Sequence, residues 1–264
     1  MSDADHSFCE AATRGKPMTH QDAKASYTQD IAEIPHAIFS NEYGFYCVPN
    51  EYHERKIATL LKNGDVYEPH TLRFLRRQVG QGDIVTGGAF IGDFFPALCE
   101  VLAPKAKLHS FEPVPISFAA ALETVRLNGL SSVALHPVAV GAEDGTAAIQ
   151  IARRSGKKIA AGERIVDTMI ADGKIAIEVK VKTIDSLVPK SRKVSLLHLD
   201  VEGFEQSALE GSARILNDNK PLVVLESGKP WKNRTFAQKL NSLVPDAGYR
   251  FMGEIEKNGI FAPG

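Results

Sequence analysis

The residues best suited to chemistry follow two apolar runs. The first run, Ile84-Val85, is followed by the glycines of GGAFIG at positions 87–92, and an acid, Glu112, follows Gly92 by twenty residues. Glycines let the backbone approach a ligand closely, the next helix presents its N-terminus, and a carboxylate can bind ribose hydroxyls. This spacing predicts a βαβ unit that binds a nucleotide-type cofactor, although a plain α/β turn would use the same glycines.

The second group of candidate residues follows the apolar run Val194 to Leu199. It reads LDVEGFE, and its candidate acids are Asp200 and Glu202. Strand alternation places His198 and Asp200 on one face of this run. Ligands of open α/β sheets bind beyond the carboxyl ends of the strands, so these acids are expected near the glycine turn. Glu226 ends a further strand, where it either joins this group or caps the following helix.

The elements that must position these residues alternate between strand and helix from Asp83 to Val244. Helical spacing is clear after Pro115, where apolar residues recur at i, i+3, i+4 and i+7, and the run from Val133 to Val140 predicts the next strand. Asn258-Gly259 predicts a closing hairpin. The pattern predicts an α/β fold with a Rossmann-like, mainly parallel sheet, helices on both faces and an antiparallel C-terminal hairpin.

The segment before this alternation predicts a polar arm over residues 1 to about 30, then a small hairpin and a helix. We therefore expect an N-terminal arm and cap over 1–66 and one larger domain over 67–264. A basic excursion at 153–158 interrupts the alternation, and a substrate lid and an exposed loop explain it equally well.

Composition excludes several classes of protein. The 264 residues are 44% hydrophobic and 24% charged, as in a soluble globular protein. With 31 basic against 32 acidic residues, the net charge of -1 gives no reason to expect a nucleic-acid partner. The three cysteines lack paired spacing, which favours a reducing compartment and neither a disulfide framework nor a zinc site. No apolar run reaches the length of about 18 residues that a membrane helix needs, so we expect a cytoplasmic protein without a membrane partner.

A set of motifs, taken together, resembles the FkbM-type S-adenosylmethionine-dependent methyltransferases. In order, they are GAFIG, FEP, NGL, AVG, TIDSL, LDVEGFE and KPLVVLE. The likeness runs from about Tyr67 to the end of the chain, and LDVEGFE is its most specific part. It implies a seven-stranded Rossmann-like sheet, S-adenosylmethionine as cofactor, and O-methylation of a hydroxyl on a small molecule such as a sugar or polyketide.

The resemblance also implies which residues contact the cofactor. Glu112 matches the ribose acid, and Glu68 belongs to a Tyr-Glu pair placed to reach the cofactor amine. The implied contacts are Glu68, Thr86, Gly88, Ala89, Phe90, Ile91, Gly92, Glu112, Pro113, Asn128, Ala139 and Asp200. Thr86 departs from the family, which usually has an acid there, so a carboxylate that could hold the cofactor's amino group is missing at this position.

Methyl transfer requires alignment of the donor with a hydroxyl, and a base can remove the hydroxyl proton. Asp200 is the candidate for that base or for orienting the hydroxyl, and Glu202 is a second candidate that could instead hold the loop. His198 is either a satisfied core residue or a group that titrates near neutral pH. These side chains could also ligate a metal, but adjacent acids are too common to predict one.

Two alternatives to an active methyltransferase stay open. The lost acid at Thr86 fits a module of the same fold that binds cofactor without catalysis. The glycine turn alone fits a nicotinamide-dependent oxidoreductase.

Overall fold

The computed structural model describes residues 31–152, 164–166 and 175–264, so the predicted arm at 1–30 and the basic excursion at 153–158 lie outside the described residues. The strands are β1 (His36–Asn41), β2 (Gly44–Pro49), β3 (Asp83–Gly87), β4 (Leu108–Phe111), β5 (Val133–His136), β6 (Ala139–Val140), β7 (Gly145–Ala152), β8 (Arg164–Val166), β9 (Ile175–Lys182), β10 (Val194–Leu199), β11 (Leu222–Glu226), β12 (Arg250–Ile255) and β13 (Asn258–Ala262). The α-helices are α2 (Lys56–Lys62), α3 (Pro69–Gln78), α4 (Phe95–Cys99), α5 (Pro115–Leu127), α6 (Ile184–Leu187), α7 (Glu205–Glu210), α8 (Ala213–Asn219) and α9 (Pro230–Leu243). Short 3-10 helices are η1 (Ile31–Glu33), η2 (Asn50–Tyr52) and η3 (Pro245–Ala247).

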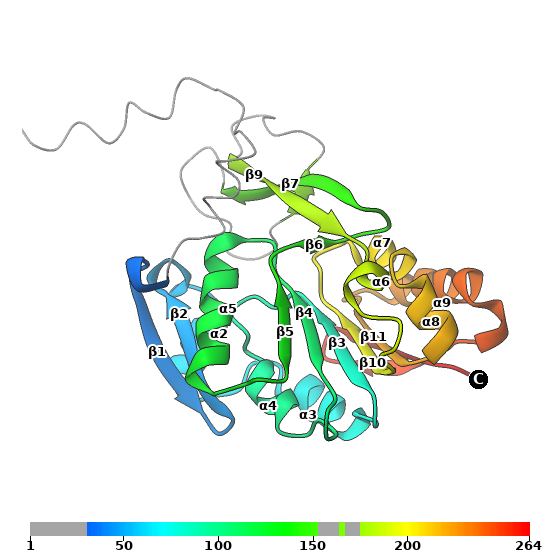
Figure 1. Cartoon of the computed structure of the whole chain (residues 1–264), viewed down its shortest axis with the longest axis horizontal. Helices are drawn as coiled ribbons and strands as arrows, with labels where there is room; N and C mark the ends of the chain where they lie inside the picture. Colours follow the sequence, from blue (N-terminus) through cyan, green and yellow to red (C-terminus); the bar gives the residue numbers. More distant parts are fainter. Residues whose placement is uncertain (1–30, 153–163, 167–174) are drawn as a thin grey trace, which may run out of the picture.

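A seven-stranded sheet forms the centre of the molecule (Figure 1). Its order is β12-β13-β11-β10-β3-β4-β5. The pairs from β11 through β5 are parallel, whereas β13 runs antiparallel to both β11 and β12. The predicted α/β fold with a mainly parallel sheet and an antiparallel C-terminal hairpin is confirmed.

Apolar residues that alternate along the central strands supply a separate core on each face of this sheet. Val85 and Leu197 pack in one core with α7, α8 and α9. Their neighbours Ile84 and Leu196 pack in the other, with α3, α4 and α5. Successive side chains of a strand point to opposite faces, and parallel strands buried on both faces are apolar throughout.

The predicted N-terminal hairpin is formed by β1 and β2, and it packs against α5. Polar contacts fix its position: the Cys47 amide donates to Thr124 Oγ1 at 3.1 Å, and the Tyr52 and Ser117 hydroxyls lie 2.7 Å apart. We call residues 31–66 the cap. The predicted boundary between the cap and the larger domain stays a prediction.

A smaller sheet, with the order β6-β9-β7-β8, was not anticipated. The sequence predicted one strand from Val133 to Val140, but the structure divides it between β5 of the large sheet and β6 of the small one. The break falls at Pro137, which has no amide hydrogen to donate to a strand ladder. The small sheet therefore begins immediately after the edge strand β5.

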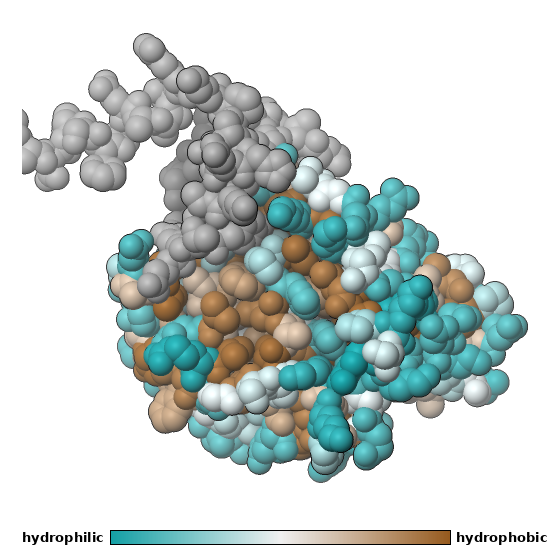
Figure 2. Space-filling model, in the orientation of Figure 1, coloured by the Kyte–Doolittle hydropathy of each residue, from teal (hydrophilic) through white to brown (hydrophobic). Residues whose placement is uncertain are grey.

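The surface near β5 carries apolar side chains. Figure 2 shows them gathered over α5 and β5, and Leu122 of α5 is 51% exposed. Among the helices of the described ranges, none has both the length and the apolar composition that a membrane crossing needs.

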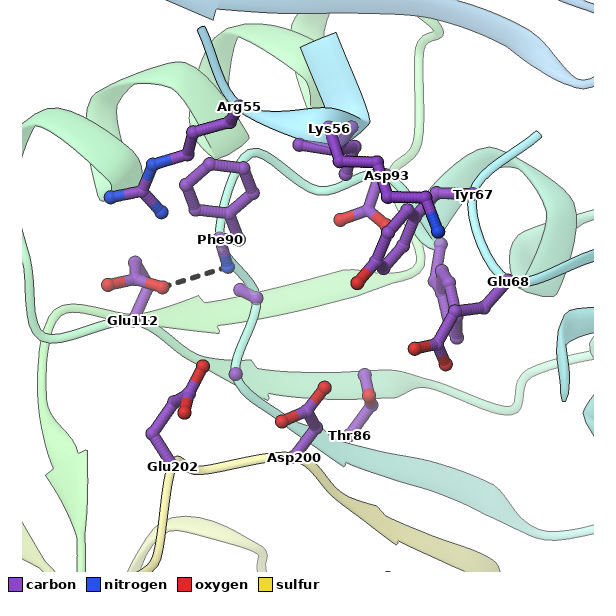
Figure 3. Close-up of a pocket in the computed structure, with 14 residues that line it drawn as sticks. Arg55, Lys56, Tyr67, Glu68, Thr86, Phe90, Asp93, Glu112, Asp200 and Glu202 are labelled. Atoms are coloured by element: carbon purple, nitrogen blue, oxygen red, sulfur yellow. Dashed lines mark hydrogen bonds between the residues drawn. The ribbon is translucent and has the colours of Figure 1, made fainter. Parts of the chain in front are cut away.

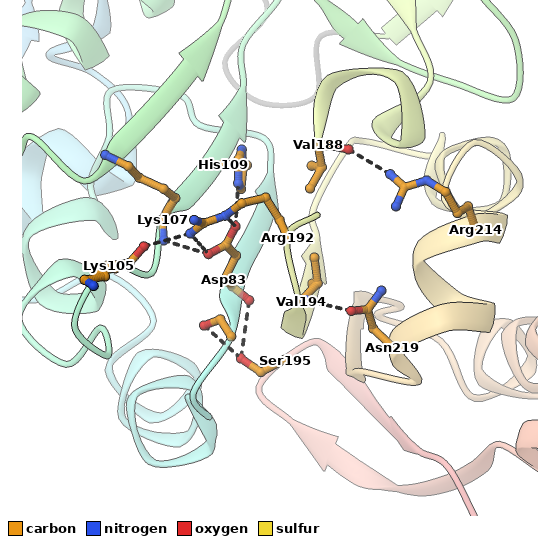
Figure 4. A network of polar contacts seen from close by, with 11 residues as sticks. Asp83, Lys105, Lys107, His109, Val188, Arg192, Val194, Ser195, Arg214 and Asn219 are labelled. Carbon is orange, nitrogen blue, oxygen red and sulfur yellow. Dashed lines mark hydrogen bonds and ion pairs between the residues drawn. The ribbon is translucent and has the colours of Figure 1, made fainter. Parts of the chain in front are cut away.

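Asp83, at the start of β3, joins three strands through a buried polar network (Figure 4). Its carboxylate accepts from the Lys107 amide at 2.8 Å, lies 2.9 Å from His109 Nε2 and accepts from Arg192 Nε at 2.7 Å. Burial alone would raise the pKa of Asp83, but the bonds from Arg192, Lys107 and His109 outweigh it and hold the pKa below its usual value.

Asp83→Asn is expected to lower the free energy of unfolding by about 3 kcal/mol at pH 7, because it removes one charge of a buried pair. The lowered pKa means that this stability is present above the unfolded pKa of about 3.9 and is lost as the pH falls through the native value. Urea denaturation at pH 7 and pH 3 should therefore show a difference between the two proteins that shrinks in acid.

Glu210→Gln is the matched control, because it removes a carboxylate from a surface pair with Lys239. Its expected cost is below about 1 kcal/mol. If Asp83→Asn were as stable as wild type at pH 7, the network would not have the role assigned to it.

Candidate functional site

Two adjoining cavities lie at the carboxyl edge of β3, β4 and β10. The first has a volume of about 230 Å³ and the second about 80 Å³. The first is lined by Arg55, Lys56, Ile57, Tyr67, Glu68, Thr86, Gly88, Ala89, Phe90, Asp93, Phe94, Glu112, Asp200 and Glu202. The second is lined by Gly88, Phe111, Glu112, Pro113, Val114, Val138, Ala139, Val140, Ile149, Asp200, Val201, Glu202 and Phe204. The shared lining residues join an acidic cavity to a largely apolar one.

The floor between the cavities is backbone, at Gly88 after the end of β3. Gly88 has a φ of 81°, and a Cβ there would lie 1.9 Å from the Asp200 carbonyl oxygen. No residue with a side chain fits this position. The glycine loop and the loop after β10 therefore touch directly, and this contact forms an open cradle for a ligand.

Glu112, directly after β4, is held by backbone amides. Its Oε2 accepts from the Phe90 amide and its Oε1 from the Val114 amide, each at 2.8 Å, and the first bond is drawn in Figure 3. These two bonds orient the carboxylate between the cavities. Because each carboxylate oxygen has more than one acceptor position, Glu112 can still accept from two hydroxyls of a ligand.

Phe90 keeps a positive φ of 46°, a conformation that is unfavourable for a residue with a side chain. Its ring lies 4.9 Å from that of Tyr52, and the Arg55 guanidinium lies 4.7 Å from its centroid. The cap therefore holds the side chain of Phe90, while the backbone amide of Phe90 faces Glu112.

The LDVEGFE loop begins where the Asp200 amide donates to the Gly87 carbonyl at 3.3 Å. Glu202 and Gly203 both have positive φ, and the buried Glu205 accepts from the Gly203 amide at 2.9 Å. Glu205, which the sequence analysis did not single out, thus holds this turn. Glu202 lines both cavities.

Acids outnumber cations around the first cavity: five carboxyl groups line it, against Arg55 and Lys56. Figure 3 shows Asp200 between Glu202 and Thr86, across the cavity from Tyr67. Burial, followed by the charges of Glu226 and Glu202, raises the pKa of Asp200 well above its usual value. Removal from water, increased by the charge of Glu68, raises the pKa of Asp93 to about 7. The cavity therefore favours a cation.

Glu68 directly precedes α3 and has a φ of 43°. Asn258 of β13, which is buried, donates from Nδ2 to Glu68 Oε2 at 3.0 Å and to Thr71 Oγ1 at 3.2 Å. The C-terminal hairpin thus positions a carboxylate that lines the first cavity.

Thr86 lines the first cavity, and His198 lies behind it. Thr86 Oγ1 is 3.0 Å from His198 Nδ1, and the imidazole stacks on Phe94 with a centroid distance of 5.8 Å. Burial lowers the pKa of His198 to about 4, so the ring is neutral at pH 7. His198 lines neither cavity.

The other predicted contacts divide into two groups. Ala89 and Phe90 line the first cavity, and Pro113 and Ala139 line the second. The residues that line neither are Ile91, Gly92 and Asn128.

Asn128 holds the cap. Its Oδ1 accepts from the Phe45 amide at 2.9 Å and its Nδ2 donates to the Phe45 carbonyl at 2.7 Å.

Several lining residues were missed in the sequence analysis. Arg55, Lys56 and Asp93 are charged examples. Asp93 directly follows the glycine motif, so its position could have indicated it, whereas Arg55 and Lys56 reach the cavity only because the cap folds back. No group of three His, Cys, Asp or Glu side chains within the described residues is arranged to hold a metal ion.

The family model named "Methyltransferase FkbM domain" matches residues 79–251. The chain belongs to the FkbM methyltransferase family. A curated relative from Beauveria bassiana (strain ARSEF 2860), named "Methyltransferase 1", is 28% identical over 48% of this chain. The match spans 57% of the length of that relative.

Solved methyltransferase structures resemble this member of the FkbM family more distantly. The FkbM methyltransferase of Methylobacillus flagellatus KT is 14% identical, with a TM-score of 0.48, over 81% of this chain and 62% of that one. M. jannaschii TYW2, solved in complex with AdoMet, is 11% identical, with a TM-score of 0.47, over 88% of both chains. At these scores the likeness adds nothing to the topology given by the strand order.

We expect the wild-type protein to lose about 3 kcal/mol of stability as the pH falls from about 6.5 to about 4, because buried His198 must stay neutral. The native pKa lies below the unfolded one, so this contribution is complete above pH 6.5 and is lost in acid. His198→Asn, whose amide can still reach Thr86, should show a flatter dependence of unfolding free energy on pH.

The control His70→Asn changes an exposed histidine and should keep the wild-type slope. Equal slopes for His198→Asn and wild type in urea melts across this range would contradict the assignment.

Proposed function

We propose that this chain is an S-adenosylmethionine-dependent methyltransferase that methylates a hydroxyl of a small molecule such as a sugar or polyketide. The observation that carries the proposal is the acidic cavity, joined to an apolar one across Glu112, in a chain with the FkbM family domain. A ligand with a cation at one end and an aromatic base at the other fits this pair of cavities.

Each part of the cofactor has matching residues in this proposal. The apolar cavity around Ala139 and Phe204 takes the adenine, and Glu112 binds the ribose hydroxyls. Gly88 admits the methionine portion to the backbone. Because Thr86 carries no charge, Glu68 supplies the carboxylate for the amino group.

The bound cofactor supplies an electrophilic methyl group on a sulfonium. Asp200 faces the cavity and orients the acceptor hydroxyl or takes its proton, and Glu202 is the second acid in reach of the cavity. His198 stays neutral and orients Thr86 from behind. Alignment of the two reactants supplies most of the rate increase in such a transfer.

A small neutral or cationic acceptor suits this cavity better than nucleic acid. Five carboxyl groups line it, and they would repel the phosphates of a nucleic-acid strand. The net charge of -1 adds no overall attraction for such a strand.

Isothermal titration calorimetry with S-adenosylhomocysteine tests the cofactor site. Wild type should bind this ligand, and Glu112→Gln should weaken binding by about tenfold or more through loss of a charged ribose contact. Glu210→Gln, on the surface, should bind as wild type does. The melting midpoint of Glu112→Gln shows whether the variant is folded.

Transfer of a labelled methyl group from S-adenosylmethionine to a panel of hydroxylated compounds then tests catalysis. Binding without transfer to any acceptor would favour the non-catalytic module. Failure of the folded wild-type protein to bind either ligand would refute the proposal.

A further inference from the structure

Glu226, the last residue of β11, does not cap a helix. The next helix, α9, begins at Pro230 after Lys229, and no side chain caps its first turn. Glu226 is half-buried at the carboxyl edge of the sheet. The alternative that it caps a helix is therefore excluded, and its carboxyl group needs another explanation.

The strand register places Glu226 beside Asp200. β10 and β11 are parallel, and their last matched pair is Leu199 with Leu225, so the residues that follow are neighbours. Side chains at matched positions of adjacent strands point to the same face. The two carboxyl groups are therefore close enough for the charge of Glu226 to disfavour a negative charge on Asp200.

The groups around this pair disfavour two negative charges. Glu202 faces Asp200 from its own loop, Glu68 faces it from the start of α3, and Tyr67 lies across the cavity. The adjacent strand β3 contributes the uncharged Thr86.

Asp93 also lines the cavity, and the cations on its wall are Arg55 and Lys56, which come from the cap. Ionisation of Asp200 beside a second acid in such surroundings is disfavoured unless a cation compensates its charge.

We propose that Asp200, which lies beside Glu226, holds a proton while the cavity holds no cation, and releases it when a positively charged ligand binds. This inference rests on the proposed function, in which that ligand is a sulfonium. Asp200 touches the cavity and Glu226 acts through it as a positioning residue.

The pair then has a defined part in the transfer. Asp200 takes the proton of the acceptor hydroxyl while the hydroxyl oxygen bonds to the methyl carbon and the carbon–sulfur electron pair passes to sulfur. Loss of the sulfonium charge restores the preference of Asp200 for its protonated form, so the proton stays on Asp200 until the product leaves.

Calorimetry in two buffers with different ionisation enthalpies measures the protons released on binding. At pH 7, S-adenosylmethionine should release more protons than S-adenosylhomocysteine, by on the order of half a proton per site. Both ligands carry the same ammonium group, so contributions from Glu68 and Asp93 cancel in this difference. The affinity for S-adenosylmethionine should also rise with pH, by up to about tenfold per unit.

Glu226→Gln should reduce this difference by about half, because a neutral neighbour lets Asp200 ionise more readily before the ligand binds. Asp200→Asn, a second variant that removes the titrating group, should do the same. Glu210→Gln should leave proton release unchanged.

The outcomes separate the two hypotheses. Equal proton release by both ligands, or an undiminished difference in both folded variants, would contradict the proposal that Asp200 holds a proton before binding. The proposed function would still stand. Failure of wild type to bind either ligand would refute the proposed function, and the role of the pair with it.

Discussion

The contact between Gly88 and the Asp200 carbonyl fixes the positions of the other site residues. Neighbouring strands β3 and β10 deliver their loops to the same edge of the sheet, and at this point the two backbones approach too closely for any Cβ. The glycine loop and the acidic loop consequently cannot move independently. Both cavities are lined by Gly88 and Asp200, so their shapes depend on one contact between main chains.

A cavity lined by so many acids carries an electrostatic cost, and each acid offsets it through a different partner. Glu112 accepts hydrogen bonds from two backbone amides, and Glu68 accepts one from the Asn258 side chain. Burial and the neighbouring acids raise the pKa of Asp200, which favours its neutral form. Buried charge is tolerated when it is hydrogen-bonded or neutralised by a proton. With these partners the cavity stays suited to a cation. The buried acids themselves lower the stability of the fold.

The sequence predicted the parts of the site that depend on local pattern. Apolar runs that end in an acid indicated Glu112 and Asp200, and the alternation of strands and helices predicted the sheet. Each of these signals is contained in a short stretch of sequence, so it can be recognised without the structure. Contacts between distant segments left no such signal. Nothing near Glu68 indicates that Asn258, 190 residues later, would orient it.

The same limit applies to Asn128 and to the strand predicted from Val133 to Val140. The cofactor contact of Asn128 stays a prediction, and nothing near this residue in the sequence indicates that its amide would bond to both main-chain groups of Phe45, as a neighbouring strand would. The apolar run from Val133 to Val140 was read as one strand, although Pro137 divides it between two sheets. In both cases the partner, and not the local pattern, decides the outcome.

Phe90 makes the cap and the carboxylate of Glu112 thermodynamically linked. Its backbone stays about 1 kcal/mol or more above a relaxed conformation, and the rings of Tyr52 and Phe90 with the Arg55 guanidinium hold it there. Withdrawal of the cap would let Phe90 relax and turn its amide away from Glu112. Because such coupling is reciprocal, a ligand that engages Glu112 tightens the cap by the same free energy with which the cap favours the ligand.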